Sequence, residues 1–283
     1  MTHIPEPTIR VCVDPTNPGQ FFACCGLLEL ANRLWNGAEG WFDHGEYLIR
    51  TKATEASLSK ILTMAHDLRI SENDTQSPNG EGSEDEGENN ADEKAMPIAI
   101  VSPIILLLDW WNDKSLKTWA GSMDPRKIFV AMCNAIDTQN NDPFNQSQVV
   151  FDAQANSETD AQSKRIEKPK KREPFYFDGR RGDSARPTDV GFSTDSLMNT
   201  LAHPVVEALC LVGLQRCRPR PTPTPRVFDY FTWHIPLPVS VVPAAVSGLI
   251  GDGDCYHFAN AFRTDQRKHK AFMPATRIPR SSQ

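Results

Sequence analysis

The sequence predicts an α+β protein built from two related α/β halves that pack together. The main observation is a pair of look-alike segments, residues 17–30 (NPGQFFACCGLLEL) and 203–216 (HPVVEALCLVGLQR). Each begins a helix with a proline in its first turn, where the missing N–H has no intrahelical partner. Each also carries a glycine, Gly26 or Gly213, within an apolar helical stripe. Because a glycine inside a helix costs about 1 kcal/mol relative to alanine, we expect another backbone to pack closely against both helices.

The chain of 283 residues is long enough for one large domain or two modest ones. We expect an N-terminal half at 1–151, a polar and basic linker at 152–174, and a basic C-terminal half at 175–283. Residues 72–95 contain nine acidic side chains and one lysine. Such a segment buries too little apolar surface to offset its ordering entropy, which predicts a disordered acidic loop. It is either a solvated spacer, which we favour, or a nucleic-acid mimic that shields the basic half.

In the N-terminal half, alternating apolar residues at 9–13 predict a strand that leads into the first helix. A hairpin with strands at 40–42 and 47–51 follows, and apolar spacing over 58–68 predicts an amphipathic helix. The run 97–111 predicts a buried strand or a strand pair split at Pro103.

Further along the chain, Asp124 and Pro125 together indicate the start of another helix. In the C-terminal half a strand is expected at 227–235. Prolines in every other position from 219 to 225 predict a stiff, extended polyproline segment.

The net charge of −6 hides an asymmetry along the chain. Residues 1–163 hold 11 Lys and Arg against 25 Asp and Glu, a charge of −14, whereas residues 164–283 hold 19 against 11, a charge of +8. A basic half of this kind indicates a polyanionic partner.

The candidate nucleic-acid contacts are the basic side chains of the linker and of the proline-rich segment, together with one glutamine at the start of the first helix. They are Lys170, Lys171, Arg172, Arg180, Arg181, Arg186, Arg216, Arg218, Arg220, Arg226 and Gln20. A guanidinium presents a planar fork that suits phosphate oxygens and guanine edges. For Gln20, capping and packing is the favoured alternative. Bases could stack on four aromatic side chains: Phe175, Tyr176, Phe177 and Phe192.

Signals for catalysis are scarce. The chain has no G-x-S-x-G, no G-x-x-x-x-G-K-[ST] and no H-E-x-x-H motif. His66-Asp67 resembles the dipeptide of metal-dependent phosphohydrolases, with His44 as a conceivable further ligand, but a solvated surface pair is the favoured interpretation. We therefore expect no catalytic residue, no metal and no cofactor.

The cysteines and the hydropathy pattern indicate a soluble protein of the cytoplasm. Seven cysteines, an odd number without C-x-x-C spacing, are expected to be reduced core residues. The longest apolar run, 98–108, is too short to span a bilayer, so no membrane contact is expected.

Several segments resemble the small Cas8-like subunit family of type I-G (formerly I-U) CRISPR effector complexes. The similar segments run in order over nearly the whole chain: 14–30 (DPTNPGQFFACCGLLEL), 108–111 (LDWW), 117–121 (KTWAG), 175–178 (FYFD), 189–193 (DVGFS) and 213–219 (GLQRCRP).

The resemblance implies a non-enzymatic subunit of an RNA-guided antiviral complex. Its partners would be other Cas effector subunits, the guide RNA, target double-stranded DNA and a separate Cas helicase-nuclease that performs cleavage. In related complexes base pairing reads the target and protein reads a short flanking motif, the PAM. The alternatives are a metal-dependent nuclease or phosphohydrolase that uses His66-Asp67, and a scaffold subunit that contacts only proteins.

Overall fold

The computed structural model describes residues 6–71, 97–120, 123–152, 170–181, 201–263 and 270–279. The predicted acidic loop at 72–95, most of the predicted linker, and the candidates Arg186 and Phe192 lie outside these ranges. In the described ranges the chain forms five α-helices and two 3-10 helices: α1 (Pro18–Leu34), α2 (Leu58–His66), η2 (Trp110–Asn112), α3 (Pro125–Asn134), η3 (Gly179–Arg181), α4 (Pro204–Arg216) and α5 (Val242–Val246).

Twelve strands occur in the same ranges, and their pairings are antiparallel. They are β1 (Ile9–Cys12), β2 (Glu39–Asp43), β3 (Glu46–Arg50), β4 (Arg69–Ile70), β5 (Ile98–Ser102), β6 (Leu106–Leu108), β7 (Arg220–Pro221), β8 (Val227–Phe231), β9 (Leu237–Pro238), β10 (Cys255–Phe262), β11 (Lys270–Phe272) and β12 (Thr276–Ile278). The α+β class is thereby confirmed.

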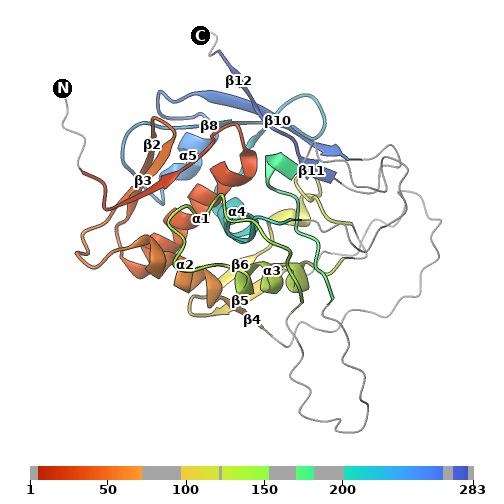
Figure 1. Ribbon diagram of the computed structural model, residues 1–283. Helices are drawn as coiled ribbons and strands as arrows, with labels where there is room; N and C mark the ends of the chain where they lie inside the picture. The colour runs from red at the N-terminus through yellow and green to blue at the C-terminus, as the bar shows by residue number, and fades with distance from the viewer. Residues whose placement is uncertain are drawn as a thin grey trace.

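The two look-alike helices, α1 and α4, pack against each other in the centre of the molecule (Figure 1). Both begin with a proline as predicted, and the side chain of Asn17 caps α1. A Cβ atom added at Gly26 would lie 2.1 Å from the carbonyl oxygen of Leu209, and one added at Gly213 would lie 2.0 Å from that of Phe22. The expected close backbone is therefore confirmed, and each helix supplies it to the other.

The first sheet contains the predicted N-terminal strand and hairpin, in the order β1-β3-β2-β9. The hairpin turns at His44 and Gly45, both at positive φ. Its outer edge is completed by β9, which comes from the C-terminal part of the chain. Trp233 links the same two parts, because its Nε1 donates to the carbonyl oxygen of Gly40 at 2.7 Å.

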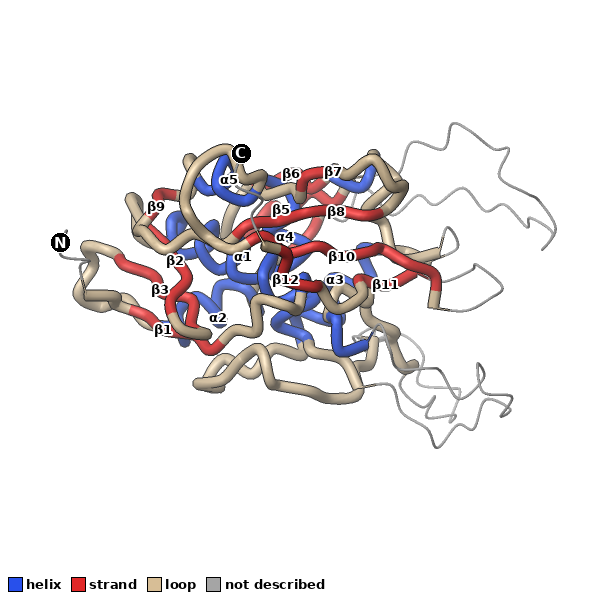
Figure 2. Tube along the Cα trace, turned by 90° about the horizontal axis from the view of Figure 1, so that it is seen from above, coloured by secondary structure: helices blue, strands red, loops and turns tan. Residues whose placement is uncertain are grey.

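The second sheet, in the order β7-β8-β10-β11 with β12 also paired to β10, covers α1 and α4 from above (Figures 1 and 2). Its strand β8 ends at Phe231, earlier than predicted. Thr232 still pairs with the carbonyl oxygen of Asp254, but the next residue, Trp233, accepts from the N–H of Phe42 in the first sheet. The chain therefore changes sheets where one longer strand was expected.

The proline-rich segment is not the rigid extended rod that alternating prolines predicted. It forms β7, which pairs with β8, and then a tight turn in which Thr222 N–H and Oγ1–H donate to the carbonyl oxygen of Val227. Arg226 closes the turn at φ 60°. The hydrogen bonds of this hairpin outweigh the local preference of proline for an extended chain.

The third sheet, β4-β5-β6, lies below the helices beside α3 (Figure 1). The predicted run at 97–111 thus forms the strand pair β5 and β6, and the start of η2 lies at its end. Asp124 caps α3 through the N–H of Arg126, as expected. On the third sheet Ile98, Ile100 and Leu108 are buried.

One continuous apolar core joins the three sheets and the helices. Six of the seven cysteines are buried, which confirms their prediction as core residues, whereas Cys12 is exposed and the prediction is wrong for it. The tryptophans of η2 lie in this core with Trp119 and Trp233.

In the described part of the chain, none of the helices has the length and apolarity that crossing a membrane requires.

Candidate nucleic-acid interface

Among the basic residues predicted for the linker, Arg172 is engaged through its side chain, whereas the exposed Lys170 and Lys171 are held through their backbone. Arg172 makes a two-pronged ion pair with Asp152, with Nε–Oδ1 and Nη2–Oδ2 distances of 2.5 and 2.6 Å. Lys171 pairs with Phe151 through the backbone, and the carbonyl oxygen of Lys170 accepts from the N–H of Asp152. Arg172 is thereby corrected from a free cation to a neutralised one.

Arg180 is likewise a structural arginine. Its guanidinium contacts both carboxylate oxygens of the fully buried Asp178 and also donates to the carbonyl oxygen of Phe144 and to Oδ1 of Asn145. Arg181 continues the same 3-10 helix, but its side chain lies outside the described structure. The guanidinium of Arg180 is therefore neutralised by Asp178, although 35% of the side chain is exposed.

Arg216, at the end of α4, holds the buried carboxylate of Glu29 in α1. The Nε–Oε2 distance is 2.9 Å, and Oε1 of the same carboxylate accepts from Arg33 at 3.0 Å. The side chain of Glu29 is 5% exposed and that of Arg216 is 43% exposed. Hydrogen bonding to Glu29 raises the pKa of Arg216. This arginine fastens α4 to α1, which sequence reasoning did not foresee.

The three remaining candidates lie on or beside the hairpin of β7 and β8 and are exposed. Arg218 precedes β7 and makes no ion pair in the part of the chain that the structure describes. Arg220, in β7, pairs with Asp229 at 2.9 Å and lies over the ring of Phe231, yet half of its side chain remains exposed. Arg226 lies over the ring of Phe262, with its guanidinium carbon 4.7 Å from the ring centroid. Arg218 and Arg220 are thus exposed at the edge strand β7, and Arg226 is exposed at the turn of the hairpin.

Gln20 is not a surface residue. It is 4% exposed, and its Oε1 accepts from the N–H of Asp14 at 2.8 Å while its own N–H donates to Oδ1 of Asn17. The predicted contact with nucleic acid is therefore corrected: the side chain of Gln20 holds the segment before α1, and its N–H is the group that Asn17 caps. The proposed stacking rings are also internal, because Phe175, Tyr176 and Phe177 are all buried.

Three lysines that the sequence did not single out lie in segments that pack beside the turn of Arg226. Lys114 and Lys117 come from the segment after η2, and Lys270 begins β11. Together with Arg226 these residues are called the cation cluster below. In the described ranges none of its four members makes an ion pair with a carboxylate. No local sequence signal reveals the cluster, because two of its lysines belong to the half predicted to be acidic.

His66 and Asp67 lie at the end of α2 on the surface. The imidazole Nδ1 is 2.9 Å from Oδ1 of Asp67, and Arg69 approaches the same carboxylate at 3.8 Å. Within the described ranges, no group of three or more His, Cys, Asp or Glu side chains is arranged to hold a metal ion. The dipeptide therefore has the geometry of the favoured surface pair.

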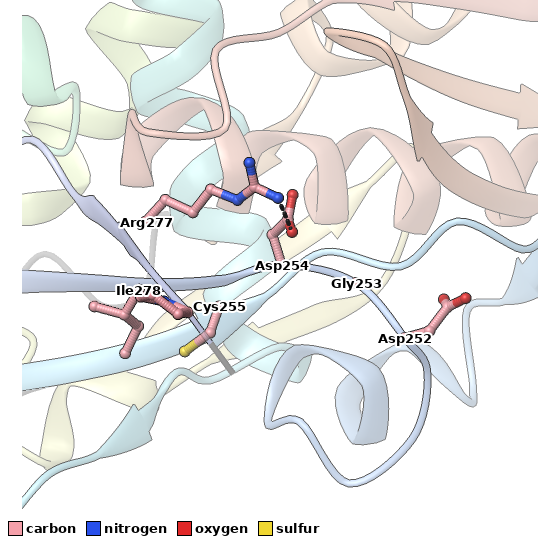
Figure 3. Close-up of a pocket in the computed structure, with 7 residues that line it drawn as sticks. Asp252, Gly253, Asp254, Cys255, Arg277 and Ile278 are labelled. Atoms are coloured by element: carbon pink, nitrogen blue, oxygen red, sulfur yellow. Dashed lines mark hydrogen bonds and ion pairs between the residues drawn. The ribbon is translucent and has the colours of Figure 1, made fainter. Parts of the chain in front are cut away.

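A pocket of about 490 Å³ opens between the turn before β10 and the end of the chain, next to Cys255 and Ile278 (Figure 3). Arg277 and Asp254 meet across it at 2.5 Å, while Asp252 points away from them. Hydrogen bonding to Asp254 raises the pKa of Arg277. Because its one arginine is neutralised in this way, the pocket offers no free cation to a phosphate.

The geometry thus separates arginines that pair with carboxylates within the fold from cations on and beside the second sheet that have no carboxylate partner among the described residues. These cations are Arg218 and the cation cluster, with Arg220 partly engaged. Comparisons with protein-family models, with curated proteins and with solved structures find no match to this chain.

Proposed function

We propose that this protein is a non-catalytic, DNA-engaging subunit of a type I-G CRISPR effector complex in the cytoplasm. It would help the guide-RNA complex bind target duplex DNA and recognise the PAM. Its other partners would be the neighbouring Cas effector subunits and a Cas helicase-nuclease that cleaves the target. The observation that carries the proposal is the region of the hairpin β7-β8, where Arg218, Arg220 and Arg226 are exposed.

Contact with partner subunits is supported by an apolar surface on the opposite side of the molecule from the second sheet (Figure 1). Val101, Ile105 and Leu107 alternate with the buried residues of β5 and β6 and are 50%, 81% and 51% exposed. Contiguous exposed apolar residues are typical of protein interfaces.

The finer architecture, two related halves that pack together, is also a proposal. It is supported by the shared start of α1 and α4 and by their reciprocal glycine contacts. In each half an antiparallel hairpin follows the helix, β2-β3 after α1 and β7-β8 after α4. An ancestral duplication would explain why each helix matches the other's surface.

Reconstitution tests the functional proposal. The full chain is co-expressed with the neighbouring Cas proteins and guide RNA, the complex is purified, and binding to a PAM-containing duplex is measured with and without this subunit. We expect co-purification and a loss of duplex binding when the subunit is left out. A complex that binds the duplex equally well without it would contradict a DNA-engaging role and favour the protein-only scaffold.

The metal-dependent nuclease is separated from this function by a cleavage assay. Labelled duplex is incubated with the full chain and Mg²⁺ or Mn²⁺, with His66→Ala as the comparison. We expect no cleavage by either protein. Cleavage that is lost in the His66→Ala variant would overturn the proposal.

Arg218→Ala is expected to flatten the dependence of log affinity on log salt by about one unit, because one phosphate contact releases about one counterion. Arg216→Ala removes the same charge but is expected to leave this slope unchanged, since Glu29 already neutralises Arg216. It should instead lower the stability of the fold by about 1–3 kcal/mol, the cost of depriving a buried carboxylate of a partner. The measurements are duplex titrations of the complex at several salt concentrations and urea unfolding of the chain. Equal slopes for wild type and Arg218→Ala would remove Arg218 from the interface.

A further inference from the structure

Three segments that are distant in sequence bring the four members of the cation cluster together. Lys114 and Lys117 lie in the segment between η2 and α3, Arg226 closes the turn before β8, and Lys270 begins β11. Lys270 is the register partner of Phe262, the residue whose ring lies under the guanidinium of Arg226. Nζ of Lys270 also reaches the carbonyl oxygen of Lys114, at 3.4 Å.

Asn260, in the middle of β10, holds two of these segments in place. Its side-chain amide donates to the carbonyl oxygens of Ser115 and Lys117, at 2.8 and 3.2 Å. Its backbone N–H donates to the carbonyl oxygen of Arg226 at 2.8 Å. Asn260 is fully buried, so this one residue fixes the main chain beneath two of the cations.

The third segment is fixed from the other side. The backbone N–H of Lys270 donates to the carbonyl oxygen of Thr118 at 3.3 Å. The chain that carries Lys114 and Lys117 is therefore held by both β10 and β11. The main chain that carries the cations is set by the fold before any ligand arrives, which reduces the entropy that binding must overcome.

The electrostatics of the cluster are unfavourable without an anion. Burial and then the charges of Arg226 and Lys117 lower the pKa of Lys270 to about 8. Burial and then the charge of Lys114 lower the pKa of Lys117. Both lysines are half-buried, so water screens their repulsion incompletely. This contrasts with Arg172, Arg180 and Arg216, each of which has a carboxylate partner.

We propose that the cation cluster of Lys114, Lys117, Arg226 and Lys270 is a preformed site for the phosphodiester backbone of a nucleic acid. The choice of nucleic acid rests on the proposed function, whereas the anionic chemistry of the ligand follows from the cluster itself. Backbone phosphates carry the negative charge that the site lacks, and contacts with them are independent of base sequence. The cluster would fix the position of the duplex while other residues read bases.

The test uses a fluorescein-labelled 30-base-pair duplex with the full chain in one arm and with the assembled effector complex in the other. The variant is Lys117→Ala/Lys270→Ala, and the control is Lys52→Ala/Lys60→Ala, which removes two exposed lysines of the N-terminal half. We expect the first variant to bind at least about tenfold more weakly at moderate salt and to flatten the salt slope by about two units. The control should bind within about twofold of wild type, because distant surface charges are screened.

A second measurement excludes a folding defect. Each of the two lysines is repelled by neighbouring cations of the cluster. The variant Lys117→Ala/Lys270→Ala should therefore melt at a temperature equal to or above that of the wild type. Lys117→Arg/Lys270→Arg keeps both charges and should retain the wild-type salt slope. Weaker binding together with undiminished thermal stability is the signature of a ligand site and not of a structural role.

The outcomes separate this inference from the proposed function. If the complex binds the duplex and Lys117→Ala/Lys270→Ala matches the control, the cluster is overturned and the DNA-engaging role stands on Arg218 and its neighbours. If the full chain binds the duplex through Lys117 and Lys270 but does not co-purify with Cas proteins, the cluster stands and the CRISPR assignment falls. Absence of wild-type duplex binding in both arms overturns the cluster.

Discussion

Gly213→Ala is expected to lower the free energy of unfolding by at least about 3 kcal/mol, enough to depopulate a fold of ordinary marginal stability at physiological temperature. The added Cβ would lie 2.0 Å from the carbonyl oxygen of Phe22 and 2.8 Å from the backbone nitrogen of Gly26. Both atoms belong to the backbone of α1, so they yield only if the whole helix moves.

The helix propensity of alanine acts in the opposite direction. Alanine is better than glycine inside a helix by about 1 kcal/mol, which would make the same substitution stabilising at an open site. Here the two helices form the centre of the core, and separating them would loosen the packing of fully buried side chains such as Phe22 and Leu209. The steric cost therefore exceeds the gain in propensity.

Urea unfolding of the full chain measures the effect, and Gly179→Ala is the matched control. Gly179 is also buried, but its added Cβ would meet its nearest neighbours at 3.3–3.5 Å, close to ordinary contact. We expect the control to change stability by less than about 1 kcal/mol. A Gly213→Ala protein as stable as the control would mean that α1 and α4 are not in backbone contact.

The helix pair is also the feature that the sequence predicted best, for a physical reason. A proline at the start of a helix and a glycine within it have local meanings that need no knowledge of distant residues. Gly26 and Gly213 therefore predicted that another backbone packs closely against each helix. The sequence did not indicate that each helix is the partner of the other. Short-range hydrogen-bonding signals, such as Asp124 before Pro125, were reliable for the same reason.

Elements whose structure depends on distant strands were predicted less well. The prolines at 219–225 favour an extended chain locally, but pairing with β8 folds the segment into a hairpin. The strand predicted to run to residue 235 ends at Phe231 because Trp233 bonds to the first sheet. Both outcomes depend on hydrogen bonds to segments that are distant in sequence. Such pairings cannot be predicted from the residues of a short segment alone.

The candidate site shows the same limit. Charge alone does not distinguish Arg216, whose carboxylate partner lies 187 residues away, from Arg218, which has no such partner among the described residues. The cation cluster was missed because Lys114 and Lys117 are isolated lysines in an acidic half, and only the topology of β10 and β11 brings them to Arg226. Clustering in sequence was therefore a poor guide to clustering in space.

Asp178→Asn is expected to lower the free energy of unfolding by about 3 kcal/mol at neutral pH, because it breaks the ion pair of a buried carboxylate with Arg180 at the centre of a hydrogen-bond network that joins separate parts of the chain. The carboxylate of Asp178 is fully buried and accepts from Nδ2 of Asn17 at 2.8 Å and from Nε and Nη2 of Arg180 at 2.9 and 2.6 Å. Asn17 caps α1, and Arg180 reaches the carbonyl oxygen of Phe144. The oxygen of an asparagine could replace Oδ1, which accepts from Asn17 and from Nε of Arg180, but its NH2 group is a donor and cannot replace Oδ2, which accepts from Nη2 of Arg180.

The pKa of Asp178 determines how the stability contributed by its carboxylate changes with pH. Burial acts to raise the pKa of Asp178, but hydrogen bonds and charge from Arg180, with smaller contributions from His203 and Asn17, outweigh it and hold the pKa below its ordinary value of 3.8. Because the folded protein binds this proton less readily than the unfolded chain, the carboxylate stabilises the fold above pH 3.8 and loses this effect as the pH falls further.

The difference in stability between wild type and Asp178→Asn should therefore be constant near neutrality and should narrow below pH 3.8. Urea titrations between pH 3 and pH 7 measure it, with Asp254→Asn as the control. Asp254 also pairs with an arginine, but the side chain of Arg277 is 66% exposed, and exposed pairs contribute less than about 1 kcal/mol. If both variants lost equally little stability, the Asp178 network would not hold α1 to the rest of the fold. We expect the larger loss of stability for Asp178→Asn because the carboxylate of Asp178 is buried, whereas both variants remove an ion pair with an arginine.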